Sequence, residues 1–80
     1  MMAKKAYVDV IASFSHDGKM LPMEVRWPDG RKFTVDRVLD VRQAASMKVG
    51  GCGVRYTCRI LGKQTYLFFE EDRWFVESKE

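Results

Sequence analysis

Short runs in which apolar and polar residues alternate fill most of this chain, and turn-forming residues separate them. A period of two places alternate side chains on opposite faces of an extended strand, whereas a helix face needs apolar residues three or four positions apart. The runs "YVDVIASF" (7–14) and "VRYTCRIL" (54–61) show the pattern well. The sequence therefore predicts an all-β protein of short antiparallel strands.

We expect six strands, at residues 5–14, 20–27, about 31 to 42, 54–61, 65–71 and 73–78. Asp-Gly dipeptides in "SHDGK" and "WPDGRKF" predict tight hairpin turns, and residues 62–64 and 72–73 are expected to form the last two. The alternation in the first strand places Val8, Val10, Ala12 and Phe14 on one face. Pro22 cannot donate a ladder hydrogen bond, so it predicts an edge position or a bulge in the second strand.

Residues 36–47 fit two interpretations, because Val35, Val38, Leu39 and Arg42 have a spacing that also suits a helix face. The aspartates and β-branched valines of this segment are poor helix formers. We therefore expect a bulged strand to about Arg42, with a helical turn at "RQAAS" (42–46).

A chain of 80 residues is expected to form a single small β domain, residues 1–80. A flat sheet of this size would leave one face wet and both edges open. We therefore predict a small antiparallel six-stranded SH3-like, partly open barrel, with a two-layer β-sandwich carrying one short helix near residues 36–47 as the alternative. The large aromatic side chains are expected to pack its core, namely Trp27, Phe33, Tyr56, Phe68 and Trp74.

The stretch "MKVGGCGVRYTCRI" (47–60) contains both cysteines and raises the question of a site. Six extended steps from Cys52 to Cys58 would separate their α-carbons by roughly 20 Å, too far for a disulfide. Their spacing does not suit zinc, and His16 lies far away. We expect Cys58 to be a structural thiol, with Gly53 in a loop. The sequence favours a protein that is not an enzyme, has no catalytic residue and holds no metal or cofactor; a thiol-dependent activity at Cys52 is the alternative.

No apolar run reaches the roughly 18 residues that a membrane-spanning helix needs, and the N-terminal segment lacks the apolar core of a secretion signal. We therefore expect a cytoplasmic protein without membrane contact. The net charge of +3 by itself says little about partners.

Residues from "RWPDGRKFTVDRVLD" to "VRYTCRILGKQTYLFFEEDRWFVE", roughly two thirds of the chain, resemble a group of small uncharacterised bacterial β domains. Some of these domains of unknown function stand alone, and others are attached to the C-terminal ends of proteins related to translesion DNA polymerases. The shared features are the turn before Lys32 and Phe33, the step at Val38, Leu39 and Asp40, Tyr56 in an arginine-flanked strand, and the closing "RWFVE". The resemblance implies a compact β domain associated with DNA transactions, and it carries over no catalytic residue.

Positive charge is unevenly distributed along the chain. No acidic residue occurs from Val41 to Phe69, and acids resume at residues 70–72. We expect an anion-binding or nucleic-acid-binding stripe centred on the fourth strand, with exposed Tyr7 or Phe69 beside it for base stacking. Its candidate residues are Arg26, Arg42, Lys48, Arg55, Arg59 and Lys63.

Two alternatives to this surface stay open. Arginines on the outer face of a sheet commonly pair with carboxylates across the strands, and Glu70, Glu71 and Asp72 are available to neutralise the stripe. The chain is also suited to a protein-protein interaction or homodimerisation module that uses an exposed edge strand and an apolar patch. The second alternative shares with the first hypothesis a small binding module rather than an enzyme.

Overall fold

The computed structural model describes residues 3–45 and 52–79, and the side chains of residues 4–43 and 53–77. These ranges contain seven strands and no helix, which confirms the all-β prediction. The strands are β1 (Ala3–Phe14), β2 (Met20–Arg26), β3 (Lys32–Thr34), β4 (Arg37–Ala45), β5 (Cys52–Ile60), β6 (Lys63–Glu70) and β7 (Arg73–Lys79).

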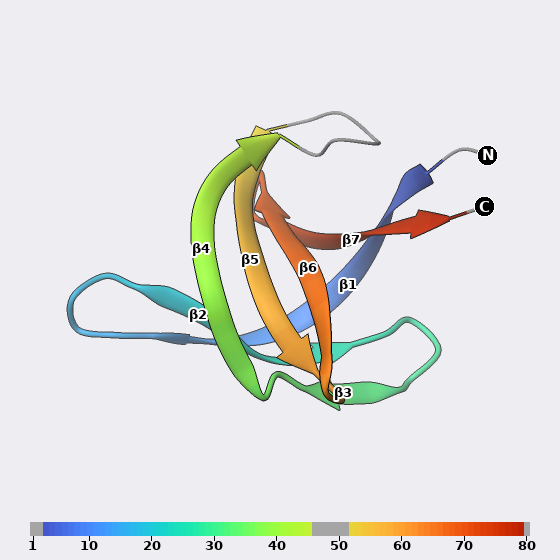
Figure 1. The fold of residues 1–80 in the computed structure, drawn as a ribbon, viewed down its shortest axis with the longest axis horizontal. Coiled ribbons are helices and arrows are strands. Elements are labelled where there is room, and N and C mark those ends of the chain that lie inside the picture. Colours follow the sequence, from blue (N-terminus) through green and yellow to red (C-terminus); the bar gives the residue numbers. More distant parts are fainter. Residues whose placement is uncertain (1–2, 46–51, 80) are drawn as a thin grey trace.

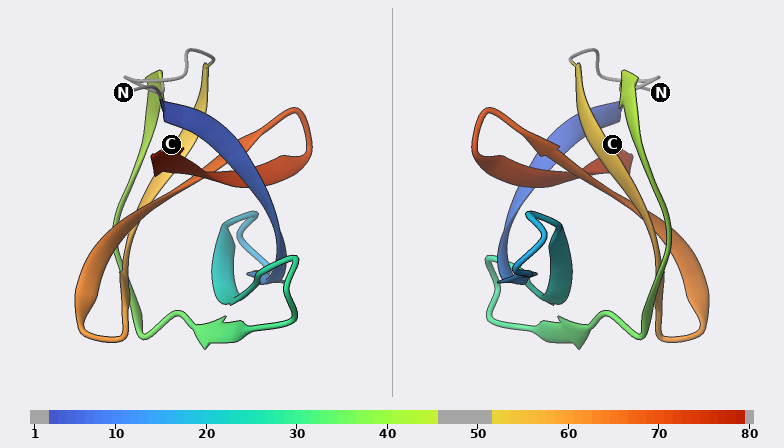
Figure 2. Two further views of the ribbon diagram at one scale, coloured as in Figure 1. Left: turned by 90° about the vertical axis from the view of Figure 1, so that its right-hand side faces the viewer. Right: turned by 90° about the vertical axis from the view of Figure 1, so that its left-hand side faces the viewer.

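The strands form one antiparallel sheet in the order β3-β2-β1-β7-β6-β5-β4, which curls into a half-barrel (Figures 1 and 2). Its two edge strands, β3 and β4, are consecutive in the chain, and the residues between them tie the edges together. The Val35 amide donates to the Met23 carbonyl at 2.9 Å, and the Asp36 amide donates to the Arg59 carbonyl at 2.8 Å. The single curled sheet is the predicted partly open barrel and not a two-layer sandwich.

The seventh strand arises because the expected strand from residue 31 to 42 is two strands. β3 pairs with β2, whereas β4 pairs with β5 on the other side of the barrel opening. The register shifts between Val38 and Asp40, so the predicted bulge is confirmed. The expected helical turn at residues 42–46 is wrong for residues 42–45, because their backbone continues the ladder with β5 as far as Ala45 opposite Cys52. Residues 46 and 47 lie outside the described residues.

Both Asp-Gly turns are confirmed. Gly18 and Gly30 adopt positive φ angles of 85° and 96° at equivalent positions of the two hairpins. The last two turns begin one residue earlier than expected, at Leu61–Gly62 and Glu71–Asp72, so that β6 begins at Lys63 and β7 at Arg73. Two central residues with positive φ match the right-handed twist of the flanking strands, which explains the shift.

The main core fills the inside of the curl. Cys58 and Leu67 are completely buried, and the rings of Tyr56 and Trp74 lie 5.2 Å apart. The Tyr56 hydroxyl donates to the Met20 carbonyl at 2.8 Å, so this buried phenol is satisfied. Burial of these side chains, at about 25 cal/mol per Å² of apolar surface, is the main term that holds the strands together.

A second buried cluster lies on the opposite face of the sheet. Phe68 and Phe75, 4% and 2% exposed, stack with ring centroids 5.1 Å apart. Tyr7 meets Phe75 edge to face at 5.8 Å, and the Lys5 ammonium lies over the Phe75 ring at 4.9 Å. Phe68 was expected in the same core as Tyr56, but it belongs to this second cluster because its neighbours Leu67 and Phe69 face the main core.

The hairpin of β1 and β2 projects from the barrel (Figure 1). The register shifts where Ile11 and Ala12 face Glu24 and Pro22, so the bulge predicted from Pro22 is confirmed. Beyond the bulge, Met20 and Leu21 of β2 still pack against the main core, whereas Phe14 on β1 is 74% exposed. The face on which the sequence places both Val8 and Phe14 is therefore buried at Val8 and exposed at Phe14, which lies near the tip of the projecting hairpin.

Candidate nucleic-acid interface

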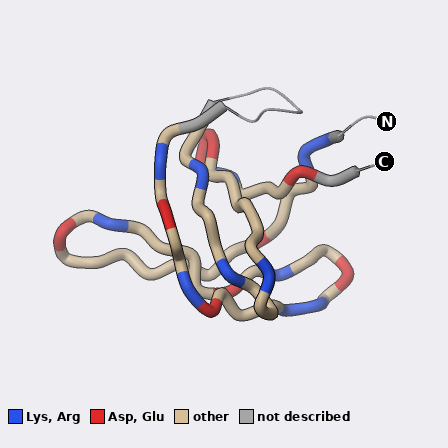
Figure 3. Tube along the Cα trace, viewed as in Figure 1, with Lys and Arg blue, Asp and Glu red and all other residues tan. Residues whose placement is uncertain are grey.

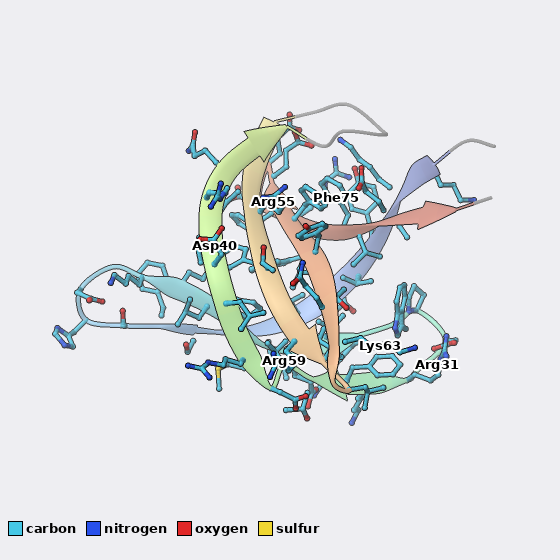
Figure 4. All side chains as sticks on the ribbon, in the orientation of Figure 1. Arg31, Asp40, Arg55, Arg59, Lys63 and Phe75 are labelled. Atoms are coloured by element: carbon cyan, nitrogen blue, oxygen red, sulfur yellow. The ribbon has the colours of Figure 1, made fainter. Side chains whose placement is uncertain are left out.

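Four arginines gather on one face of the neighbouring strands β4 and β5. Arg42 lies directly opposite Arg55, and Arg37 lies directly opposite Arg59. Residues that face each other across a ladder share one side of a sheet, so we name Arg37, Arg42, Arg55 and Arg59 together the arginine face. Figure 3 shows the resulting blue segments on both strands, and Figure 4 shows Arg55 and Arg59 towards opposite ends of β5.

Little negative charge balances this face. Asp40 is the one acidic residue in β4 and β5, and it binds the Arg42 Nε at 2.7 Å. Within the described ranges, no ion pair involves Arg37, Arg55 or Arg59. Like charges directly opposite each other destabilise a β ladder. The arginine face therefore combines two repulsive pairs with a single carboxylate.

The Arg55 guanidinium lies over an aromatic ring rather than beside an acid. Its guanidinium carbon lies 4.6 Å from the centroid of the Tyr66 ring, and Phe68 lies opposite it on β6. The Arg55 Nε is buried and has no hydrogen-bond partner. A cation on an aromatic face is stabilised by the ring quadrupole, but the orphaned donor costs about 1–3 kcal/mol. The strand thus retains a positive charge that the protein itself does not neutralise.

The three acids at residues 70–72 form no ion pair with the arginine face among the described side chains. Glu70 binds the Lys5 Nζ at 2.7 Å, and this hydrogen bond raises the pKa of Lys5. Glu71 and Asp72 form the turn between β6 and β7, where both are exposed, and neither has an ion pair with a described side chain. Direct ion pairing of these acids with the stripe, which is one of the open alternatives, is therefore not found among the described side chains.

The structure does not bring all the predicted residues of the stripe together. Arg26 lies on β2, separated from β5 by three strands, and binds Glu24 at 2.7 Å. Lys63 pairs with Ile60 on the face of the main core, so it is not on the arginine face. Lys48 lies outside the described residues. Arg42, Arg55 and Arg59 are the predicted residues that do share one face.

Two residues of this surface were missed in the sequence. Arg37 joins the arginine face because the bulge at Leu39 sets the register of β4, and no sequence signal fixed that register. Tyr66 is the aromatic residue beside Arg55, and it is 42% exposed. Phe69, expected to be an exposed stacking residue, packs against the main core, while Tyr7 lies beneath Arg73 at 4.5 Å. The alternation in "TYLFF" indicates that Tyr66 faces away from the main core.

Among the described side chains, Cys58 does not have the features of a reactive thiol. Cys58 is completely buried and free, and burial raises its pKa to about 11, so the thiol is protonated at neutral pH. The prediction that Cys58 lies on the core face of its strand is confirmed. Cys52 and Gly53 begin β5 rather than a loop, and the side chain of Cys52 lies outside the described ones. A Cβ at Gly53 would lie 2.4 Å from the Phe69 carbonyl oxygen, which explains a glycine within a strand.

Among the described residues, no three His, Cys, Asp or Glu side chains gather where they could hold a metal ion. The same residues contain no helix that is long and apolar enough to span a membrane.

The fold and the site define a class: a small all-β half-barrel with an arginine face on two adjacent strands. Comparisons with protein-family models, curated proteins and solved structures found no match to this chain.

Proposed function

We propose that this protein binds single-stranded nucleic acid through the arginine face. The observation that carries the proposal is the two arginine pairs that lie opposite each other across the ladder, Arg42 with Arg55 and Arg37 with Arg59. A polyanion laid over such a surface replaces repulsion between guanidinium groups with phosphate contacts. Arginine suits this role because its planar donors bind phosphate oxygens in pairs.

The two pairs are spaced along the strands, which suits an extended backbone rather than a single anion. Arg55 and Arg59 lie four positions apart along β5, a distance of roughly 13 Å. The neighbouring strand places Arg42 and Arg37 alongside, about 5 Å away. The arginine face therefore offers positive charge along a track that several successive phosphates can occupy.

Tyr66 supplies the contact that favours a single strand over a duplex. Its ring already lies beside the Arg55 guanidinium, and 42% of the residue is exposed. Bases of a single strand are free to stack on such a ring, whereas the bases of a duplex are not. The sequence resemblance to β domains of polymerase-related proteins supports the same class of partner and stays a prediction.

The one ion pair on the face does not prevent binding. Arg42 and Asp40 are neighbours on the same strand, and both side chains are well exposed. Exposed ion pairs of this kind contribute only about 0–1 kcal/mol, so a phosphate can take the place of the carboxylate.

The direct test is a titration of a fluorescein-labelled oligothymidylate, followed by fluorescence anisotropy. We expect binding that weakens roughly 20- to 50-fold between 50 and 200 mM NaCl, as three or four phosphate contacts to a single strand require. The double variant Arg37→Gln/Arg59→Gln should lose most of the binding, whereas Arg26→Gln/Arg31→Gln, with the same change in charge, should keep it. Equal loss in both variants would show that net charge, and not the arginine face, attracts the oligonucleotide.

A second candidate function is self-association along β4. This nine-residue strand is an edge of the sheet and carries Leu39 and Val41, which are 41% and 45% exposed. An exposed edge of this length is a template for pairing with another strand. Sedimentation equilibrium from 5 to 500 μM tests it: a dimer is expected, and a monomer throughout that range would exclude it.

A further inference from the structure

A small apolar pocket opens at one end of the barrel, and Arg55 of the arginine face lies towards the other end. It has a volume of about 230 Å³ and lies between the β2–β3 hairpin and the turn from β5 to β6. Trp27 and Phe33 meet edge to face at 6.4 Å and form one side of it. Its other walls include Val25, Ile60, Leu61 and Leu67. A cavity of roughly 150 Å³ holds benzene, so this one has room for a ring and a short chain.

Lys63 gives this apolar pocket a single charged group. Its side chain lines the pocket, and it has no ion pair among the residues that the structure describes. The acid of the adjoining hairpin, Asp29, is already bound: its carboxylate accepts from the Arg31 amide at 3.0 Å and from the Arg31 Nε at 2.7 Å. These hydrogen bonds lower the pKa of Asp29. Figure 4 shows Lys63 and Arg31 in the same region of the molecule.

Leu61 beside the pocket occupies an unfavourable backbone position. Its φ is 53°, in the first of the two turn positions where Asn or Gly is preferred, and the residue is 73% exposed. A left-handed conformation costs a residue other than glycine roughly 1–2 kcal/mol. An exposed leucine in a strained turn contributes little to folding, but here it extends the apolar wall of the pocket beside Lys63.

We propose that this pocket is a binding site for a small apolar monocarboxylate. The ring or branched body of such a ligand fills the space beside Trp27 and Phe33, and its carboxylate binds the Lys63 ammonium. Buried apolar contact and one oriented ionic hydrogen bond are the usual components of a small-molecule site. The site is distinct from the arginine face, because Lys63 lies on the other side of the sheet.

The test uses phenylacetate as the probe, with ¹⁵N-edited NMR of the full chain. We expect saturable shifts of the Trp27 indole and Leu61 amide signals, with a Kd of roughly 1 mM. The neutral isostere phenylacetamide should bind roughly tenfold more weakly, and benzylamine should not bind. Absence of shifts at these two residues up to 20 mM phenylacetate would overturn the proposal, and equal affinity for phenylacetamide would overturn the role of Lys63.

Three variants separate the pocket from folding effects. Lys63→Gln should weaken phenylacetate binding roughly tenfold, whereas Lys32→Gln, on the opposite face of β3 from Phe33, should not change it. Leu61→Asn should raise the thermal midpoint, because Asn tolerates a positive φ, and still weaken binding. Because that variant is more stable than the parent, its loss of affinity cannot be a failure to fold. Unchanged affinity in both Lys63→Gln and Leu61→Asn would contradict the site.

Discussion

Arg42 on β4 lies directly opposite Arg55 on β5, on the same face of the sheet. The guanidinium of Arg42 is bound to Asp40, while that of Arg55 rests on Tyr66 with its Nε lacking a partner. A second like-charged pair, Arg37 with Arg59, follows along the same two strands. Such like-charged pairs weaken a ladder, so they suit a surface whose positive charge is neutralised by a bound ligand.

Replacing Arg37 with glutamate should stabilise the protein while weakening its binding to oligothymidylate. The variant Arg37→Glu exchanges a repulsive contact with Arg59 for an attractive one, which is worth about 0.2–1 kcal/mol. Urea denaturation in 20 mM NaCl measures the gain, and Arg37→Gln should show a smaller one. A fall in the free energy of unfolding would contradict the repulsion between the two arginines.

Tyr66 is predicted to contribute base stacking. Tyr66→Ala should weaken binding of a single strand by about 1–3 kcal/mol, roughly 5- to 150-fold, and leave duplex binding unchanged. Tyr66→Phe keeps the ring and should bind like the parent. Anisotropy titrations with matched single-stranded and duplex oligonucleotides measure both values; an equal loss for the two forms would exclude stacking.

The second aromatic cluster should matter as much for stability as the main core. Phe75 is 2% exposed and is stacked on Phe68, so Phe75→Ala should lower the free energy of unfolding by about 3–5 kcal/mol. Phe14→Ala removes the same side chain from a position that is 74% exposed and should change it by less than about 0.5 kcal/mol. Thermal denaturation of both variants makes the comparison, and a similar midpoint for the two would refute the cluster.

Alternation of side chains sufficed to predict the strands and the barrel, because a period of two is a local property of the chain. It also placed Cys58 in the core and Arg55 with Arg59 on one face. Alternation could not show that the chain breaks at Val35 and Asp36, since the hydrogen bonds of these residues go to β2 and β5, far away in sequence. The split into β3 and β4 was therefore missed.

The candidate surface was predicted only in part, because it too depends on contacts between residues that are far apart in sequence. The sequence shows which residues share a strand face, but the neighbours across the sheet depend on register. The bulge at Leu39 decides that Arg37 faces Arg59, and the turn at Leu61 and Gly62 decides that Lys63 faces the main core. Composition and charge alone reveal neither the position of this bulge nor that of this turn.

The buried thiol of Cys58 should make the protein less stable at alkaline pH. Its pKa is about 11 in the folded state against an ordinary value of 9.0, so the unfolded chain loses this proton first as the pH rises. Stability from this group is present below pH 9 and is lost between about pH 9 and 11. Burial raises the pKa of Tyr56 as well, which acts in the same direction. Urea denaturation from pH 7 to 10.5 should show the decline, and a smaller one in Cys58→Ala; an identical decline would exclude the thiol as a cause.

The salt dependence of oligothymidylate binding tests the central claim most directly. Each phosphate contact to a single strand contributes about −0.7 to the slope of log K against log salt concentration. Removing two arginines in Arg37→Gln/Arg59→Gln should therefore reduce the magnitude of that slope by about 1.4, while Arg26→Gln/Arg31→Gln leaves it as in the parent. A slope that is the same in all three proteins would contradict binding through the arginine face.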